Sequence, residues 1–193
     1  MDERTIPRFI FAAMLAAIIL PACTSVRAPY QPRTGESQDT TTARNLNSQA
    51  ADIMESAPDQ AEALLRDALT ADVYFGPAHN NLGVLLMQRG ELYGAANEFE
   101  WARRLLPGHP DPRLNLGMTL ELAGKTADAM DAYRSALEVY PGYLPAIMAL
   151  TRAELRTRHT TDDTKSRLED IALRSMDPTW SQWAEVQLTR LSP

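Results

Sequence analysis

The chain has 193 residues, of which 45% are apolar and 23% are charged, a balance typical of a globular protein. Its formal net charge of -6 gives no basic footprint for nucleic acid. One cysteine and three histidines are too few to suggest a metal site, and a single cysteine cannot form an internal disulfide. We therefore expect no metal, no cofactor and no nucleic-acid partner.

Residues 1–22 have the order of a secretory signal peptide. Arg4 and Arg8 precede an uncharged apolar run over residues 9–20, and small residues then lead to Cys23. The apolar run is too short for a membrane-spanning helix, which needs about 20 residues. Residues 20–23, LPAC, resemble the lipobox of bacterial lipoproteins. The resemblance implies cleavage before Cys23 and attachment of palmitate and other acyl chains to this residue, so that a lipid anchor holds the chain to a membrane.

Two other interpretations of the N-terminus stay open, namely cleavage by the ordinary signal peptidase and an uncleaved anchor helix. Residues 20–22 are a poor A-x-A-like cleavage site, which favours lipidation. Thr24 follows the cysteine, where an aspartate tends to retain lipoproteins of Gram-negative bacteria in the inner membrane. The resemblance thus implies the outer membrane, facing the periplasm. Residues 23–41 read as the anchor and a flexible tether rich in Pro, Ser, Thr and Gln.

Two later segments align with each other without a gap. The first begins at Ala78 and reads AHNNLGVLLMQRGELYGAANEFEWARRLLPGHP, and the second begins at Pro112 and reads PRLNLGMTLELAGKTADAMDAYRSALEVYPGYL. The recurring positions carry glycine, alanine, an aromatic ring or proline, and all pairs have the same separation: Gly83 and Gly117, Gly90 and Gly124, Ala95 and Ala129, Phe99 and Tyr133, Ala102 and Ala136, Pro107 and Pro141. Glycine allows close helix contact or ends a helix, and proline stops one.

A helix–turn–helix unit with a period of about 34 residues is that of the tetratricopeptide repeat, and the separation of the two segments matches it. The chain resembles this family over residues 76–143. The resemblance implies an all-α solenoid in which antiparallel helix pairs form a right-handed superhelix. It divides this region into repeats at about 76–109 and 110–143.

The period extends in both directions, so we expect the repeat domain to cover residues 42–191. Ala61, Leu65 and Ala68 precede their counterparts by one period, which predicts a first repeat over 42–75 with Gln49 and Ser56 in place of the glycines. Residues 144–177 read as a degenerate fourth repeat. Asp177-Pro178 then starts a helix over 178–191 that bears two tryptophans. We favour a capping role for this helix over a docking role, since an uncapped array exposes an apolar end.

The family resemblance places binding residues on the first helix of each pair, which lines the concave face. The expected peptide-binding residues are Asn81, Asn115, Met87, Met118, Met148, Arg152 and Arg156. In some members asparagines at the positions of Asn81 and Asn115 bind a ligand backbone, although local bonding between helices is the alternative. The methionines read either as an adaptable floor or as core. Arg152 and Arg156 lie one turn apart and suit a carboxylate, unless they form a solvated face.

No catalytic motif is present in the sequence, so we expect a protein that is not an enzyme and has no small-molecule substrate. A lipobox followed by a few tetratricopeptide repeats resembles the TadD-like and pilotin-type lipoproteins of pilus and secretion systems. This resemblance implies a scaffold that binds a protein or peptide segment during envelope assembly. The alternative is an adaptor for an envelope enzyme in peptidoglycan turnover or protein quality control. Neither the partner nor the oligomeric state follows from the sequence.

Overall fold

The computed structural model describes residues 38–191, so the expected signal peptide, Cys23 and most of the expected tether lie outside the described part of the chain. This part is all-α. Its nine helices are α1 (Thr40–Ile53), α2 (Pro58–Ala71), α3 (Gly76–Gln88), α4 (Leu92–Leu105), α5 (Asp111–Leu122), α6 (Thr126–Val139), α7 (Leu144–Thr157), α8 (Asp162–Arg174) and α9 (Pro178–Leu191).

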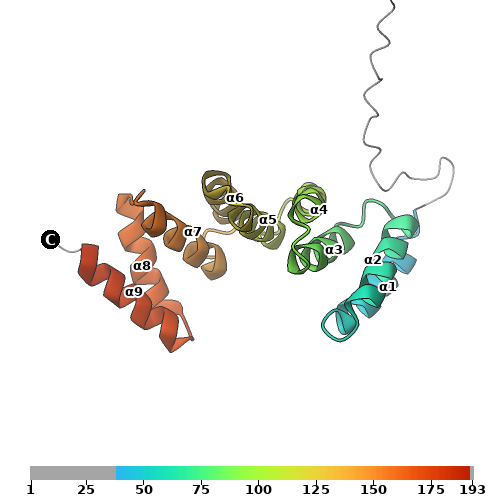
Figure 1. Ribbon diagram of the computed structural model, residues 1–193, viewed down its shortest axis with the longest axis horizontal. Helices are drawn as coiled ribbons and strands as arrows, with labels where there is room; N and C mark the ends of the chain where they lie inside the picture. The colour runs from blue at the N-terminus through green and yellow to red at the C-terminus, as the bar shows by residue number, and fades with distance from the viewer. Residues whose placement is uncertain (1–37, 192–193) are drawn as a thin grey trace, which may run out of the picture.

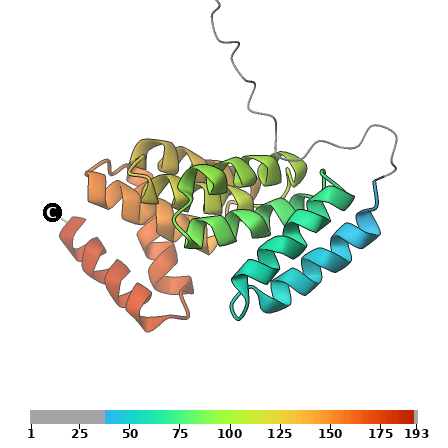
Figure 2. The same cartoon turned by 45° about the vertical axis from the view of Figure 1, so that its right-hand side comes forward.

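The helices form antiparallel pairs that follow one another in chain order along the long axis of the molecule (Figure 1). Helices α1, α3, α5 and α7 contact one another in sequence and make an inner layer, whereas α2, α4 and α6 contact only the inner helices beside them. The two ends of the array bend toward the same side, so the molecule is an arch (Figures 1 and 2). The fold class expected from the repeat, an all-α solenoid of stacked helix pairs, is confirmed.

The close approach of paired helices depends on one glycine in each of two inner helices. A Cβ atom at Gly83 would lie 2.7 Å from Cε1 of Phe99, and one at Gly117 would lie 2.3 Å from Cε1 of Tyr133. Both rings are fully buried. The recurring glycine and the recurring aromatic residue are therefore two halves of one contact between the inner and outer helix of a pair.

The turns after the inner helices α3, α5 and α7 each contain a left-handed residue. Gly90 and Gly124 take this conformation with φ of 78° and 77°, as expected for residues that end a helix. The same turn after α7 uses Arg158, one repeat period after Gly124, with φ of 58°. Arginine in this conformation is strained, so the fourth turn carries a cost that the second and third do not.

Helix α1 begins inside the segment expected to belong to the tether. The side chain of Asp39 accepts a hydrogen bond from the backbone N–H of Thr42 at 2.9 Å and caps the helix. Thr40 donates to the carboxylate of Asp72 at 2.7 Å, and Asp39 N–H donates to the carbonyl of Ala71 at 3.1 Å. These bonds hold the start of α1 against the end of α2.

Helix α9 covers the last part of the core. Trp180 and Trp183 are half-buried, meet edge to face with their ring centroids 5.2 Å apart, and pack against a cluster that includes Leu168, Ile171 and Ala184. The backbone of α9 approaches that of α8 and no other described helix. The tryptophans therefore contribute to the packing of the terminal pair, α8 and α9.

Candidate functional site on the concave face

Asparagine side chains form a hydrogen-bonded row across three inner helices. Asn81 on α3 donates from Nδ2 to Oδ1 of Asn47 on α1 at 2.9 Å. Asn115 on α5 donates to Oδ1 of Asn80 on α3 at 3.0 Å, and Asn80 makes a long contact of 3.5 Å with Asn81. We call Asn47, Asn80, Asn81 and Asn115 the asparagine row.

The row is longer than the two asparagines predicted from the sequence, because it also includes Asn47 on α1. Asn47 lies one repeat period before Asn81, so the period itself contains the signal. The row ends at Ala149 on α7, which occupies the next equivalent position and offers no polar group. The sequence left two roles open for these asparagines, ligand contact and hydrogen bonding between helices. The structure shows the hydrogen bonding between helices.

This bonding leaves part of the row available. A side-chain amide has two N–H donors and a carbonyl oxygen with two lone pairs. In the part of the chain that the structure describes, the N–H groups of Asn47 and the carbonyl oxygen of Asn115 take part in none of these side-chain bonds. All four side chains are half-buried, so they reach the surface of the concave face. Mutual bonding holds them in fixed orientations, which favours recognition of an extended backbone.

The three predicted methionines lie in different environments. Met87 packs against the core of the first helix pairs, and Met148 packs against the terminal cluster around Ile171. Met118 is 39% exposed and lies at the surface. The three methionines therefore pack in different places, and Met118 is the most exposed of them, since Met87 and Met148 are half-buried.

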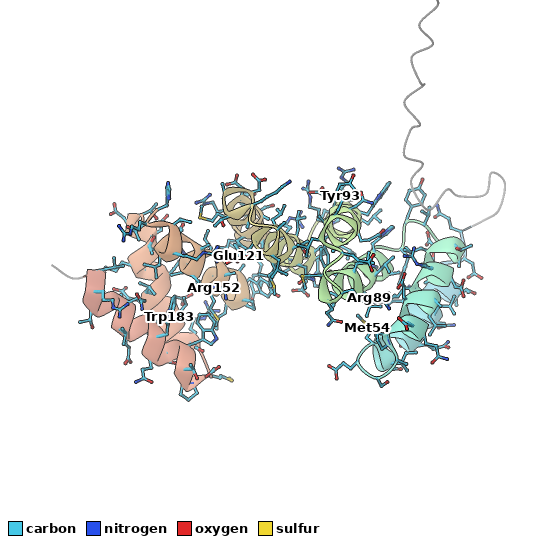
Figure 3. All side chains as sticks on the ribbon, viewed as in Figure 1. Met54, Arg89, Tyr93, Glu121, Arg152 and Trp183 are labelled. Atoms are coloured by element: carbon cyan, nitrogen blue, oxygen red, sulfur yellow. The ribbon has the colours of Figure 1, made fainter. Side chains whose placement is uncertain are left out.

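Arg152 and Arg156 do point the same way, but a carboxylate of the chain already lies between them. Glu121 on α5 is 3.3 Å from Nη2 of Arg152 and 2.8 Å from Nη1 of Arg156 (Figure 3). The hydroxyl of Tyr133 on α6 donates to the same carboxylate at 2.8 Å. Arg156 also donates to the hydroxyl of Thr126 at 3.2 Å. Three helices thus meet at one charged centre.

The electrostatics of this centre favour a charged Glu121. Burial alone raises the pKa of the Glu121 carboxyl, but the hydrogen bond from Tyr133 and the two guanidiniums outweigh burial and hold this pKa below its ordinary value. Burial and the nearby carboxylate raise the pKa of the Tyr133 hydroxyl, so it stays protonated and remains a donor. The side chain of Glu121 is only 10% exposed, so it contacts the guanidiniums of Arg152 and Arg156 from the more buried side and limits their movement.

A groove of about 440 Å³ opens above this centre. Its lining is Met118, Glu121, Leu122, Arg152 and Arg156. Leu122 is 64% exposed, and Met118, one turn before it on α5, is 39% exposed. The groove therefore joins exposed apolar side chains from α5 to guanidinium groups from α7.

His79, one of the three histidines, lies in the interior and has a structural environment. Its Nδ1 is 2.6 Å from Oε2 of Glu98, its Nε2 is 2.9 Å from the carbonyl oxygen of Val73, and its ring stacks on Trp101 at 5.7 Å between centroids. His79 and Glu98 are both buried. Across residues 38–191, no group of His, Cys, Asp and Glu side chains is arranged to hold a metal ion, and no helix there is long and apolar enough to cross a bilayer.

No protein-family model matches the sequence, and none of the curated proteins matches it. Solved structures do resemble it. PilF of Pseudomonas aeruginosa aligns with a TM-score of 0.70 and 19% identity, over 79% of this chain and 69% of PilF. MamA aligns with a TM-score of 0.61 and 18% identity, over 79% of this chain and 83% of MamA.

A third similar structure was solved with a ligand. The first tetratricopeptide repeat domain of Spaghetti (RPAP3), bound to the HSP90 peptide SRMEEVD, aligns with a TM-score of 0.59 and 17% identity, over 62% of this chain and 96% of that domain. At these identities the likenesses concern the fold. The described part of this chain is a solenoid of the tetratricopeptide type.

Proposed function

We propose that the chain is a binding scaffold whose concave face holds a segment of a partner protein. The observation that carries this proposal is the asparagine row, which places four amide side chains in fixed orientations across α1, α3 and α5. Amides offer donors and acceptors without charge, so they suit the backbone of an extended peptide whatever its sequence.

The structural likenesses support a peptide partner. The RPAP3 domain, which shares the stacked helix pairs, was solved with a bound peptide. The groove beside the asparagine row adds exposed apolar and charged side chains, which are the groups that give sequence preference to a peptide site. On this account the chain binds and positions its partner and does not catalyse a reaction.

We further propose that the scaffold is a lipoprotein of the bacterial envelope, anchored through Cys23 and facing the periplasm, where it serves assembly of a pilus or secretion complex. The lipobox-like residues 20–23 and the polar segment that follows support the anchor. The likeness of the fold to PilF supports this class of scaffold. A test of the anchor is palmitate labelling in cells of the unchanged chain and of Cys23→Ser. We expect the substitution to abolish incorporation, and undiminished labelling would contradict the anchor.

The binding role is tested by crosslinking in intact cells followed by recovery of the chain. The variant is Asn47→Ala/Asn81→Ala/Asn115→Ala, which removes one amide from each of the three inner helices. Asn97→Ala is the matched control, because Asn97 is an exposed asparagine on the outer helix α4. We expect the triple variant to lose partners that the unchanged chain and the control both recover. Identical partner sets for all three proteins, at equal thermal stability, would sink the proposal.

A further inference from the structure

Two rows of exposed side chains face each other across the groove between α5 and α7. Met118 and Leu122 lie one turn apart on α5, with exposed fractions of 39% and 64%. Arg152 and Arg156 lie one turn apart on α7, and their side chains are 48% and 51% exposed. Both rows belong to the lining of the same groove. An apolar row and a basic row therefore run side by side on the inner layer.

The basic row retains charge after its contacts within the chain are counted. Two guanidiniums stand against one lining carboxylate, that of Glu121, so the groove keeps an excess positive charge. Each guanidinium has five N–H donors. The contacts of Arg152 and Arg156 with Glu121 and Thr126 engage only some of these donors, and half of each side chain is open to solvent.

The excess charge is local and opposite in sign to the whole chain, whose net charge is -6. Helix α3 carries no charged side chain at the positions that correspond to the α5 residues of the groove. These positions are Val84, Met87 and Gln88, one repeat period before Met118, Glu121 and Leu122. The arginine pair is therefore a feature of this groove and does not recur along the array. A charged pair that occurs in only one repeat favours binding of an oppositely charged segment at one position along the array.

We propose that this groove selects an acidic amphipathic segment of the partner. Two side-chain carboxylates of the segment bind Arg152 and Arg156, and an adjacent apolar side chain of leucine or methionine size covers Met118 and Leu122. The inference rests on the proposed function, because it names the chemistry of the partner that the concave face holds.

The spacing of the arginines defines the spacing of the acidic residues. Side chains four residues apart on a helix lie about 6 Å apart. A helical segment matches this with carboxylates at i and i+4, and an extended one matches it with carboxylates at i and i+2, whose repeat is about 6.7 Å. The segment binds through internal side chains, so it needs no free C-terminus.

Glu121 is a positioning residue in this account. Its carboxylate, on a side chain that is 10% exposed, contacts both guanidiniums, whose side chains are 48% and 51% exposed. Its own bond to Tyr133 ties this arrangement to α6. Loss of Glu121 leaves Arg152 and Arg156 in place but no longer fixes their side chains. The groove then still attracts acidic segments, but it discriminates less between segments whose acidic residues have the matching spacing and those that do not.

The test is selection of random linear peptides displayed on phage through their C-termini, so that no free terminal carboxylate is present. The bait is the full chain, compared with Arg152→Glu/Arg156→Glu and with Arg104→Glu. Arg104 is a matched control, because it is an exposed arginine on the outer helix α4. Enriched peptides are then made with amidated C-termini and their Kd values are measured with each protein, together with the Kd for Glu121→Gln.

The unchanged chain and the control are expected to enrich Asp or Glu at i and i+4 or at i and i+2, next to Leu, Met or Phe. The double charge reversal is expected to lose this preference and to bind the selected peptides at least about tenfold more weakly, since a charge-assisted contact accounts for such a factor. Glu121→Gln is expected to bind acidic peptides of both matched and unmatched spacing with similar Kd.

Three results would overturn the inference. Peptides without acidic enrichment that need the asparagine row, but not the arginines, would contradict the acidic segment while leaving the proposed function intact. Equal weakening by Arg104→Glu would show a general charge effect. Failure of any peptide to bind the folded chain would contradict both this inference and the concave-face function.

Discussion

The ring of Tyr133 occupies the space that a side chain at Gly117 would need, since a Cβ atom there would lie 2.3 Å from Cε1 of the ring. We expect Gly117→Ala to separate α5 from α6 or to displace the buried ring. Overpacking of this kind lowers the free energy of unfolding by about 1–3 kcal/mol, whereas the higher helix propensity of alanine raises it by roughly 1 kcal/mol. We therefore expect a net loss of stability. Urea denaturation followed by circular dichroism measures the change.

The control for this prediction is Gly108→Ala. A Cβ atom at Gly108 meets nothing within 4 Å, and the residue lies in the turn before α5. We expect a change of less than about 0.5 kcal/mol, as is usual for surface substitutions. An equal loss of stability in both variants would show that the Gly117–Tyr133 contact is not the cause.

These glycine and aromatic positions are the part of the fold that a repeat pattern predicts well. Each of them satisfies a local steric demand that recurs once per repeat, so the demand is visible as identity between Gly83 and Gly117 or similarity between Phe99 and Tyr133. The first inner helix departs from this pattern, with Gln49 at the glycine position, so the signal for Asn47 is its separation of one period from Asn81.

The charged centre of the site was less predictable for a physical reason. Glu121 lies on the inner helix α5, but its contacts come from Tyr133 on α6 and from Arg152 on α7. Such contacts depend on side-chain reach between helices and do not repeat along the array. The pairing of His79 with Glu98 could not be predicted for the same reason, because the equivalent positions of the other repeats do not carry this pair of residues.

Arg158 is expected to cost stability through its backbone conformation. Its φ of 58° is the left-handed region that Gly90 and Gly124 occupy in the equivalent turns. We expect Arg158→Gly to stabilise the chain by about 1 kcal/mol. Removal of the side chain relieves the backbone strain, and this gain exceeds the cost of the greater conformational entropy that glycine has in the unfolded chain. Thermal denaturation measures this, and Arg158→Ala is the control, since alanine retains the Cβ atom. Stabilisation by alanine as large as that by glycine would assign the effect to the lost charge.

The pKa of Glu121 predicts a dependence of stability on pH. This pKa is lowered in the folded chain from the ordinary value of 4.5, so ionisation of Glu121 stabilises the fold above that value, and the contribution is lost as the pH falls through the folded pKa. We expect Glu121→Gln to destabilise the chain at neutral pH by about 1.5–3 kcal/mol, the range for a hydrogen bond to a charged group.

The difference between the two proteins should shrink as the pH falls from 4.5 through the lowered pKa of Glu121 in the folded chain, because this carboxyl then becomes neutral in the unchanged chain as well. Urea denaturation at several pH values measures the difference. Glu169→Gln provides the control on the exposed surface of α8, with little difference expected at any pH. A difference for Glu121→Gln that stays constant down to acidic pH would contradict the assigned charge.

The buried Glu98 carboxylate is expected to contribute strongly to stability. It lies 2.6 Å from Nδ1 of His79, while Nε2 of the same ring faces the carbonyl of Val73 at 2.9 Å. Removal of one partner of a buried hydrogen bond leaves the other without its partner and costs about 1–3 kcal/mol. We expect a loss of this size for Glu98→Ala and a smaller loss for Glu98→Gln, which retains an acceptor oxygen. Glu100→Ala, at a partly exposed ion pair on the same helix, should cost about 1 kcal/mol or less. Similar losses for Glu98→Ala and Glu100→Ala would contradict the role of the buried pair.

The central claim is that the partner binds the concave face, and photocrosslinking at single positions in intact cells tests it most directly. A photoreactive amino acid replaces Met118, which is 39% exposed in the groove, or Tyr93, which is 89% exposed on the outer helix α4 (Figure 3). The account predicts a light-dependent adduct with a partner protein at position 118 and a much weaker one at position 93. An adduct that forms at position 93 and not at position 118 would contradict it.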